Sequence, residues 1–223
     1  HQSGRVTVNL APADLKKEGP VYDLPMALGF LLTTKQIDFD YKDKLFLGEL
    51  SLDGKIRPVK GVLSMAILAR DIGISEIYVP KENAPEASVI EEISVIPVAN
   101  FLDLIAHLLG KSKIAPAPKI DLEKFFSDDE SLLDMSFIRG QEHAKRALEI
   151  AAAGSHNVLL NGPPGSGKTM LAKTMPSILP RLTVPEALEV TKIFSVSGQL
   201  PREAALISKR PFRSPHHSAS AVS

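Results

Sequence analysis

Apolar residues in the first half of the chain recur at the spacings of short strands and helices. Val6, Val8 and Leu10 alternate with polar residues, a pattern that predicts a half-buried strand over residues 5–10. Asp53-Gly54, between two apolar runs, is a strong signal for a hairpin turn. The other runs predict helices over 23–32, 62–70 and 101–109 and strands over 45–52, 55–59, 77–79 and 95–98. This order of strands and helices predicts an α/β layer.

The second half of the chain reads mainly as helices around one glycine-rich turn. Residues 141–153 form an alanine-rich amphipathic pattern that Gly154 ends, which predicts a helix. The other elements predicted here are a strand over 158–161, helices over 168–176 and 184–194, and a proline-containing loop over 209–217.

Residues 111–134 differ in composition from the segments on either side of them. They combine Ala115-Pro-Ala-Pro118 with a run of acidic side chains and few apolar ones. Such a stretch buries too little apolar surface to offset the entropy lost on ordering, so an extended, solvated linker is predicted. A regulatory or docking tail is the alternative reading of the acidic run. The predicted organisation is therefore a domain at 1–110, the linker at 111–134 and a domain at 135–223.

One stretch of the second domain carries a specific chemistry. An apolar run leads into a turn that satisfies G-x-x-x-x-G-K-[ST], and a predicted helix follows, which is the context in which this motif cradles phosphates. Lys168 is expected to reach the β- and γ-phosphates of ATP, and the Thr169 hydroxyl to hold Mg²⁺. The residues predicted to bind nucleotide are Gly162, Pro163, Pro164, Gly165, Ser166, Gly167, Lys168 and Thr169.

Composition narrows the class of protein. The 223 residues are 44% hydrophobic and include no cysteine, as in a globular protein without disulfide or thiol chemistry. A nucleotide loop, with neither a signal peptide nor an apolar run long enough for a membrane, predicts a cytoplasmic protein without membrane contact. The chain begins with His1 rather than Met, so a fragment cut at both ends is expected.

Charge is distributed unevenly along the chain. Residues 1–134 contain 15 Lys and Arg against 21 Asp and Glu, whereas residues 135–223 contain 11 against 5. A polyphosphate site accounts for much of the basic excess, and contact with nucleic acid is the open alternative. Arg210 and Arg213 are candidates for contacts with DNA phosphates or with a neighbouring subunit, or for a solvated loop.

From Phe137-Ile-Arg-Gly-Gln-Glu-His143 through the glycine-rich turn to Pro180, the sequence resembles AAA+ ATPases. More narrowly it resembles the ComM/YifB family of magnesium-chelatase-like proteins, whose loop after the nucleotide site is similar to Arg210-Pro-Phe-Arg-Ser-Pro-His-His217. The resemblance implies a ring-forming motor, hexameric when full-length, and in the ComM branch a DNA helicase that drives branch migration in natural transformation. It also implies that Ile138 lies near the adenine. The alternative is a magnesium-chelatase-like protein remodeller or chelatase motor subunit.

The first domain resembles the Lon-protease fold, an S5-like α/β domain. The similar stretches are Glu18-Gly-Pro-Val-Tyr-Asp-Leu-Pro-Met26, Gly48-Glu-Leu-Ser-Leu-Asp-Gly54 and Pro58-Val-Lys-Gly-Val-Leu-Ser64. The resemblance puts Val21 at the position of the nucleophile and Leu63 at that of the base, and neither side chain transfers a proton. Lys60 and Ser64 lie on other turns of the predicted helix. We therefore expect an inactive domain, and the fold class α/β: an S5/Lon-protease-like domain followed by a truncated P-loop AAA+ domain.

The carboxylates that complete a phosphoryl-transfer site are missing from the predicted second domain. Hydrolysis needs acids that hold Mg²⁺ and position water, usually at the end of an apolar strand. Residues 135–223 contain no aspartate, and the glutamates after the loop, none at such a position, are Glu186, Glu189 and Glu203. No catalytic set is complete, so we expect nucleotide binding without turnover and place the missing acids beyond residue 223. His216 and His217 are a weak zinc candidate, because adjacent side chains of an extended chain point in opposite directions.

Overall fold

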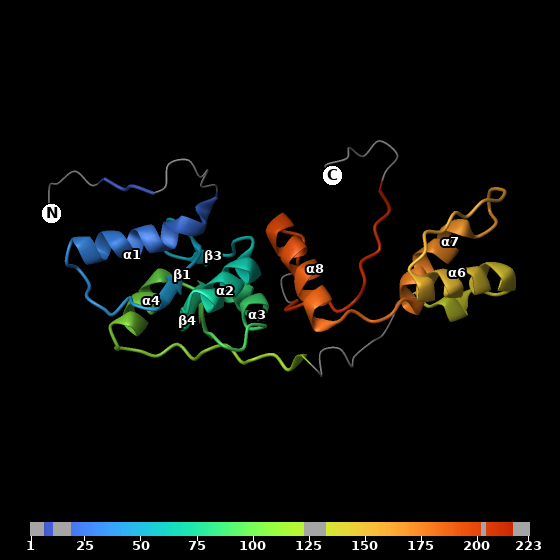
Figure 1. Ribbon diagram of the computed structural model, residues 1–223. Coiled ribbons are helices and arrows are strands. Elements are labelled where there is room, and N and C mark those ends of the chain that lie inside the picture. Colours follow the sequence, from blue (N-terminus) through green and yellow to red (C-terminus); the bar gives the residue numbers. More distant parts are fainter. Residues whose placement is uncertain (1–6, 11–18, 123–132, 202–203, 216–223) are drawn as a thin grey trace. The chain divides into compact units, whose positions relative to one another are not determined.

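The computed structural model describes residues 7–10, 19–122, 133–201 and 204–215. It divides into two compact units (Figure 1), the first comprising His1–Asp121 and Glu189–Leu206 and the second Leu122–Leu188 and Ile207–Ser223. In the described ranges, no helix is both long and apolar enough to cross a membrane.

The first unit is an α/β layer, as its pattern of apolar residues predicts. Its helices and turns of 3-10 helix are η1 (Pro20–Tyr22), α1 (Asp23–Thr33), α2 (Val62–Asp71), η2 (Lys81–Asn83), α3 (Ala84–Ala87) and α4 (Phe101–Leu108). Its strands are β1 (Lys44–Phe46), β2 (Glu49–Leu50), β3 (Ile56–Arg57), β4 (Glu76–Pro80) and β5 (Ser94–Val98).

Three of these strands form a parallel sheet in the order β1-β4-β5, and β2 and β3 form an antiparallel hairpin. The register pairs Leu45 with Ile77, and Ile77 with Val95. Parallel neighbours require crossover connections, which α2 provides between β1 and β4 and α3 between β4 and β5.

Both faces of the sheet are covered, so its strands are apolar on both sides. One face packs against α1 and α4 in a single cluster, which contains Leu24, Leu28, Phe46, Ile56, Tyr78, Ile96, Val98 and Leu104. The alternate residues of β4 and β5 are also buried, and these strands contact α2 and α3. Alternation of side chains along a strand explains why adjacent residues such as Ile77 and Tyr78 enter different layers.

Two strand predictions for this unit differ from the structure. Residues 7–10 adopt no strand, and Val8 and Leu10 are exposed, while residues 5 and 6 lie outside the described residues. The run predicted as one strand over 45–52 is divided. Its first part pairs with β4 and its second with β3, because the chain leaves the parallel sheet where the Leu47 N–H donates to the Tyr78 carbonyl at 2.9 Å.

The second unit is helical around a small core. Its helices are η3 (Met135–Phe137), α6 (Glu142–Gly154), α7 (Lys168–Thr174) and η4 (Met175–Ile178), and the division between units falls within α8 (Val184–Ser197). The core consists of Met135, Ile138, Leu148 and Leu171, with half-buried neighbours that include Leu160 and Ile178. The helix boundaries lie within a few residues of those predicted from the apolar spacing.

The division of the chain differs from the predicted domains in two places. Part of the stretch predicted as a linker lies on the first unit: the Ala117 N–H donates to the Val95 carbonyl at 2.8 Å, and the Ile114 N–H to His107 Nδ1 at 2.9 Å. The first bond satisfies a carbonyl of the edge strand β5 and the second attaches the chain to α4, contacts that composition alone does not reveal. Residues 123–132 lie outside the described residues. Glu189–Leu206, predicted in the second domain, group with the first unit.

Candidate functional site

The predicted phosphate-binding loop connects residues 158–161 to the helix α7. Gly165 and Gly167 have φ angles of +80° and +84°, a region that side chains with a Cβ rarely adopt. Gly167 is also the N-cap of α7. The two glycines therefore supply the left-handed turns that curl the loop back before the helix begins, as the motif predicts.

Lys168 lies against this loop rather than extending into solvent. Its ammonium donates to the carbonyls of Gly162 and Pro163, each at 2.8 Å, and contacts Ser166 Oγ at 3.3 Å. The first intrahelical bond of α7 runs from the Leu171 N–H to the Gly167 carbonyl at 2.9 Å, so the preceding N–H groups have no acceptor within this helix. A cation and N–H groups without an intrahelical acceptor, beside an exposed loop, are the donor set that a polyphosphate requires.

The apolar run before the loop does not form the predicted strand. Residues 158–161 have no strand assignment, and Leu159 is 93% exposed. A strand is defined by hydrogen bonds to a neighbour, and the two sheets that the described residues form both belong to the first unit. The sequence pattern identified a segment suited to a sheet, but the described part of the second unit offers it no partner strand.

Ile138 and the remaining loop positions were predicted to contact nucleotide. Ile138 is buried in the core of the second unit beside Leu148 and Leu171. Its adenine contact stays a prediction. Pro163, Pro164 and Thr169 are exposed along the loop and the first turn of α7.

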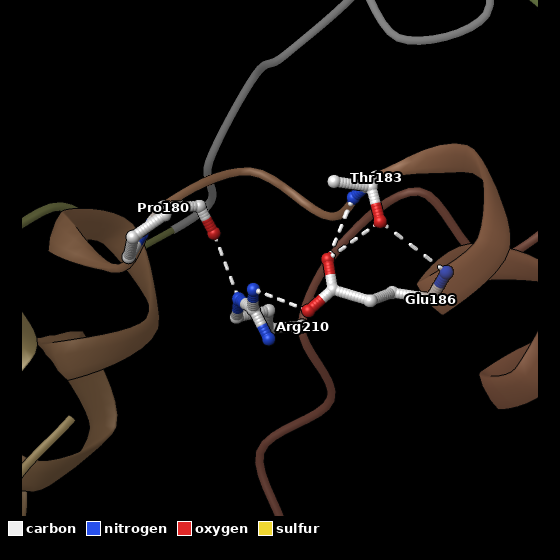
Figure 2. Close-up of polar contacts among 4 residues, drawn as sticks. All are labelled: Pro180, Thr183, Glu186 and Arg210. Atoms are coloured by element: carbon white, nitrogen blue, oxygen red, sulfur yellow. Dashed lines mark hydrogen bonds and ion pairs between the residues drawn. The ribbon is translucent and has the colours of Figure 1, made fainter.

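Glu186 is one of the three glutamates that follow the loop, and its carboxylate is held by neighbours at the start of α8 (Figure 2). Its Oε2 accepts from the Thr183 N–H at 2.8 Å and from the Thr183 hydroxyl at 3.0 Å. Arg210 donates to Oε1 of Glu186 at 3.2 Å and to the Pro180 carbonyl at 2.7 Å. The Thr183 N–H and hydroxyl, then Arg210, lower the pKa of Glu186 below its ordinary value, so it remains a carboxylate.

This arrangement is a capping box, in which Thr183 and Glu186 satisfy each other's backbone at the first turn of a helix. The spacing Thr-x-x-Glu was present in the sequence as the signal for it. Glu186 therefore has a structural role, while Glu189 is exposed on α8 and Glu203 lies outside the described residues.

No metal centre forms among the described ranges: no three His, Cys, Asp or Glu side chains gather there. The weak zinc candidates His216 and His217 lie outside those ranges. His107 accepts the Ile114 N–H through Nδ1 and packs edge-on against Tyr78, with ring centroids 5.8 Å apart.

The two positions that the sequence resemblance predicts to match a Lon catalytic pair carry buried apolar side chains. Val21 is 9% exposed, and Leu63, in the first turn of α2, is fully buried. The Leu63 N–H donates to Oε2 of Glu86 at 3.3 Å. Glu86 is itself buried, and its carboxylate also accepts from Asn83 at 2.7 Å and from the Ser195 hydroxyl at 2.6 Å.

This buried carboxylate was not predicted from the sequence. Glu86 and Ser195 lie 109 positions apart, and no local pattern connects them. Two further bonds join the same site: the Gly61 N–H donates to the Ser195 carbonyl at 3.2 Å, and Asn83 exchanges hydrogen bonds with the backbone of Val59. The C-terminal part of α8 is thereby attached to the first unit, which explains why Glu189–Leu206 belong to it.

The α/β unit, the glycine-rich loop and the helix after it define a magnesium-chelatase-like protein. The family model described as "Magnesium chelatase, subunit ChlI" matches residues 134–223, and the model described as "Subunit ChlI of Mg-chelatase" matches residues 1–83. The chain belongs to the ComM/YifB family of magnesium-chelatase-like AAA+ proteins.

The assignment to this family rests on the similarity to two relatives. Competence protein ComM of Haemophilus influenzae is 45% identical over 219 residues, and the uncharacterized protein YifB of Escherichia coli is 42% identical over 222 residues. Each comparison covers 97% of this chain and 42% of the relative, so the chain spans about two fifths of their length. The Lon protease of Mycoplasma mobile is 25% identical over 135 residues, which is 55% of this chain and 16% of that protease.

Proposed function

We propose that this chain carries the nucleotide-binding part of an AAA+ motor that uses ATP and Mg²⁺ in the cytoplasm. The observation that supports the proposal is the loop over 162–169, whose glycines adopt positive φ and whose Lys168 ammonium lies against the loop backbone. Lys168 would contact the β- and γ-phosphates, and the Thr169 hydroxyl would hold Mg²⁺. Bound Mg²⁺ would neutralise phosphate charge during transfer.

We expect residues 1–223 to bind nucleotide without hydrolysing it. Charge-assisted bonds to phosphate are worth roughly 1.5–3 kcal/mol each, so the loop supports an affinity in the micromolar to millimolar range, about −8 to −4 kcal/mol. The carboxylate of Glu186 is engaged by Thr183 and Arg210, and Glu189 is exposed on α8. We expect ADP to bind nearly as well as ATP, because the described residues supply few ligands for the γ-phosphate beyond Lys168.

Titration calorimetry of residues 1–223 with ATP and ADP, in the presence of Mg²⁺, tests this proposal. Lys168→Ala should weaken nucleotide binding at least about tenfold, since it deletes a charge-assisted contact. Lys173→Ala is the matched control, because Lys173 is an exposed lysine in the last turn of the same helix. Equal affinities for wild type and Lys168→Ala would refute the assignment of the loop. Steady phosphate release by residues 1–223, lost in Lys168→Ala, would show that the acids needed for hydrolysis are already present.

We further propose that the whole protein forms a hexameric ring and drives branch migration of DNA during natural transformation. The support is the similarity to a protein named for competence and the basic character of residues 135–223. Salt-dependent binding of branched DNA by the full-length protein, together with DNA-stimulated ATP hydrolysis, would support a DNA motor.

A protein remodeller or chelatase motor subunit is the second candidate, favoured by the magnesium-chelatase model that matches residues 134–223. ATP hydrolysis by the full-length protein that is indifferent to DNA, with no DNA binding at low salt, would favour this candidate over the DNA motor.

The Lon-like unit is proposed to be a scaffold without peptidase activity. A dyad needs a hydroxyl and an amine within reach of each other, whereas the corresponding positions hold Val21 and Leu63, both buried. Buried apolar side chains at these positions contribute to the core of the unit instead.

A further inference from the structure

A pocket of about 580 Å³ lies in the second unit, away from the phosphate-binding loop. It borders η4, which directly follows the C-terminal end of α7, whereas the loop precedes the N-terminal end of that helix. Its walls come from three segments: residues 134–137, the chain over 176–182, and residues 208–210. All three belong to the second unit.

Hydrogen bonds between the segments hold the walls together. The Met135 N–H donates to Ser177 Oγ at 3.0 Å, which joins the first segment to the second. Arg210 donates to the Pro180 carbonyl and to Glu186, as Figure 2 shows, which joins the third segment to the second. A pocket whose walls are tied in this way is organised before any ligand arrives, so less entropy is lost on binding.

The charge of the pocket favours an anion. Arg181, Lys209 and Arg210 line it, and Asp134 is the one acid among its lining residues. Asp134 Oδ1 accepts the Ser136 N–H at 2.7 Å and caps η3. Arg210 pairs with Glu186 at 3.2 Å, so its charge is already balanced. Arg181 and Lys209 against Asp134 leave the lining with a positive balance. Arg213 lies outside the lining but is exposed three residues after Arg210.

The pocket also presents an aromatic ring. Phe137 lines it and is 62% exposed, although Met135 and Ile138 on either side are buried in the core. Phe212, two residues after Arg210, is 46% exposed. Large aromatic side chains that stay exposed among cations are suited to stacking on bases while the cations contact phosphates.

We propose that this pocket binds a single-stranded segment of DNA, with phosphates at Arg181 and Lys209 and a base stacked on Phe137. A single strand is required because the bases of a duplex are already stacked and present only their edges in the grooves. This inference rests on the proposed function as a DNA motor. It assigns the site at which one strand of a separated duplex would be held.

Fluorescence anisotropy of a fluorescein-labelled 12-nucleotide oligo-dT with residues 1–223, without nucleotide, tests the proposal. Arg181→Ala/Lys209→Ala should weaken binding about tenfold or more and should lower the slope of log affinity against log salt by about 1 to 2. The control is Lys145→Ala/Arg146→Ala, which removes two charges from α6 that pair with Glu142 and Glu149. It should leave the affinity within about twofold.

The aromatic contact has its own pair of variants. Phe137→Ala should weaken binding about 5- to 150-fold, because it deletes one stacked base, whereas Phe137→Tyr keeps a ring and should bind like wild type. Lys173→Ala should also bind oligo-dT like wild type, because Lys173 is exposed on α7 and does not line the pocket. Circular dichroism is used to check that each variant is folded.

The outcomes separate this inference from the proposed function. Oligo-dT binding that is unchanged in both Arg181→Ala/Lys209→Ala and Phe137→Ala overturns the pocket assignment but leaves a DNA motor with a site elsewhere. Equal losses in the test and control charge variants also overturn it, since attraction would then be non-specific. If residues 1–223 do not bind oligo-dT at all, the pocket assignment is also overturned. If the full-length protein binds no DNA either, the DNA motor itself fails.

Discussion

Glu86→Ala should destabilise the first unit more than any exposed substitution. Glu86 is 4% exposed, and its carboxylate accepts from Asn83, Leu63 and Ser195. Alanine removes the acceptor and leaves the Asn83 amide and the Leu63 N–H buried without it, and each such donor costs about 1–3 kcal/mol. With the lost bond to Ser195, we expect a total of about 3–5 kcal/mol in the free energy of unfolding.

Ser195→Ala separates the attachment of α8 from the rest of this network. It removes one hydrogen bond to a carboxylate, worth about 1.5–3 kcal/mol, and leaves the Asn83 and Leu63 bonds to Glu86 in place. In the Glu86→Ala background, Ser195→Ala should lower the free energy of unfolding by at least about 1 kcal/mol less than it does in wild type, because the hydrogen-bond acceptor of Ser195 is already absent.

Urea unfolding of residues 1–223, followed by far-ultraviolet circular dichroism, measures these changes. The chain has no tryptophan, so fluorescence is less informative. Glu82→Ala and Ser197→Ala are the matched controls, since both residues are exposed close to their counterparts, and each should change the free energy by less than about 0.5 kcal/mol. A loss below about 1 kcal/mol for Glu86→Ala, or strict additivity with Ser195→Ala, would refute the reasoning.

Two further predictions concern Glu186 and the Lon-like unit. The depressed pKa of Glu186 contributes stability that is present above its ordinary pKa near 4.5 and is lost as pH falls. Wild type should therefore lose more stability than Glu186→Gln between about pH 5 and pH 3. Melting temperatures that decrease equally in both proteins over this range would contradict the prediction. The full-length protein should not degrade unfolded casein with ATP. Degradation that disappears in Lys60→Ala or Ser64→Ala would show that the positions of the dyad were misassigned.

The parts of the fold that the sequence predicted are those with local causes. Helices α1, α2, α4 and α6 follow from apolar spacing, because a helix satisfies its hydrogen bonds within itself, and α6 ends at the expected Gly154. The loop before α7 follows from glycines whose positive φ is a property of single residues. Family resemblance, likewise carried by contiguous residues, was confirmed by ComM and YifB.

Strands and contacts between distant segments were predicted less well, because their partners are not local. The apolar run over 158–161 has the composition of a strand, yet without a neighbour among the described residues it remains irregular, while the run over 45–52 divides between two partners. A strand obtains its hydrogen bonds from another segment. Its sequence pattern therefore indicates that a segment is suited to a sheet, whereas only the tertiary structure shows whether a partner strand lies beside it.

The sequence by itself therefore determined the α/β class, the helices and the glycine-rich turn before α7. Only the tertiary structure revealed that Ser195 donates to Glu86 across 109 positions, that Arg210 joins Glu186 and Pro180, and that Phe137 stays exposed beside cations. Burial and charge balance are properties of the space around a side chain, and that space is filled by residues far away in the chain.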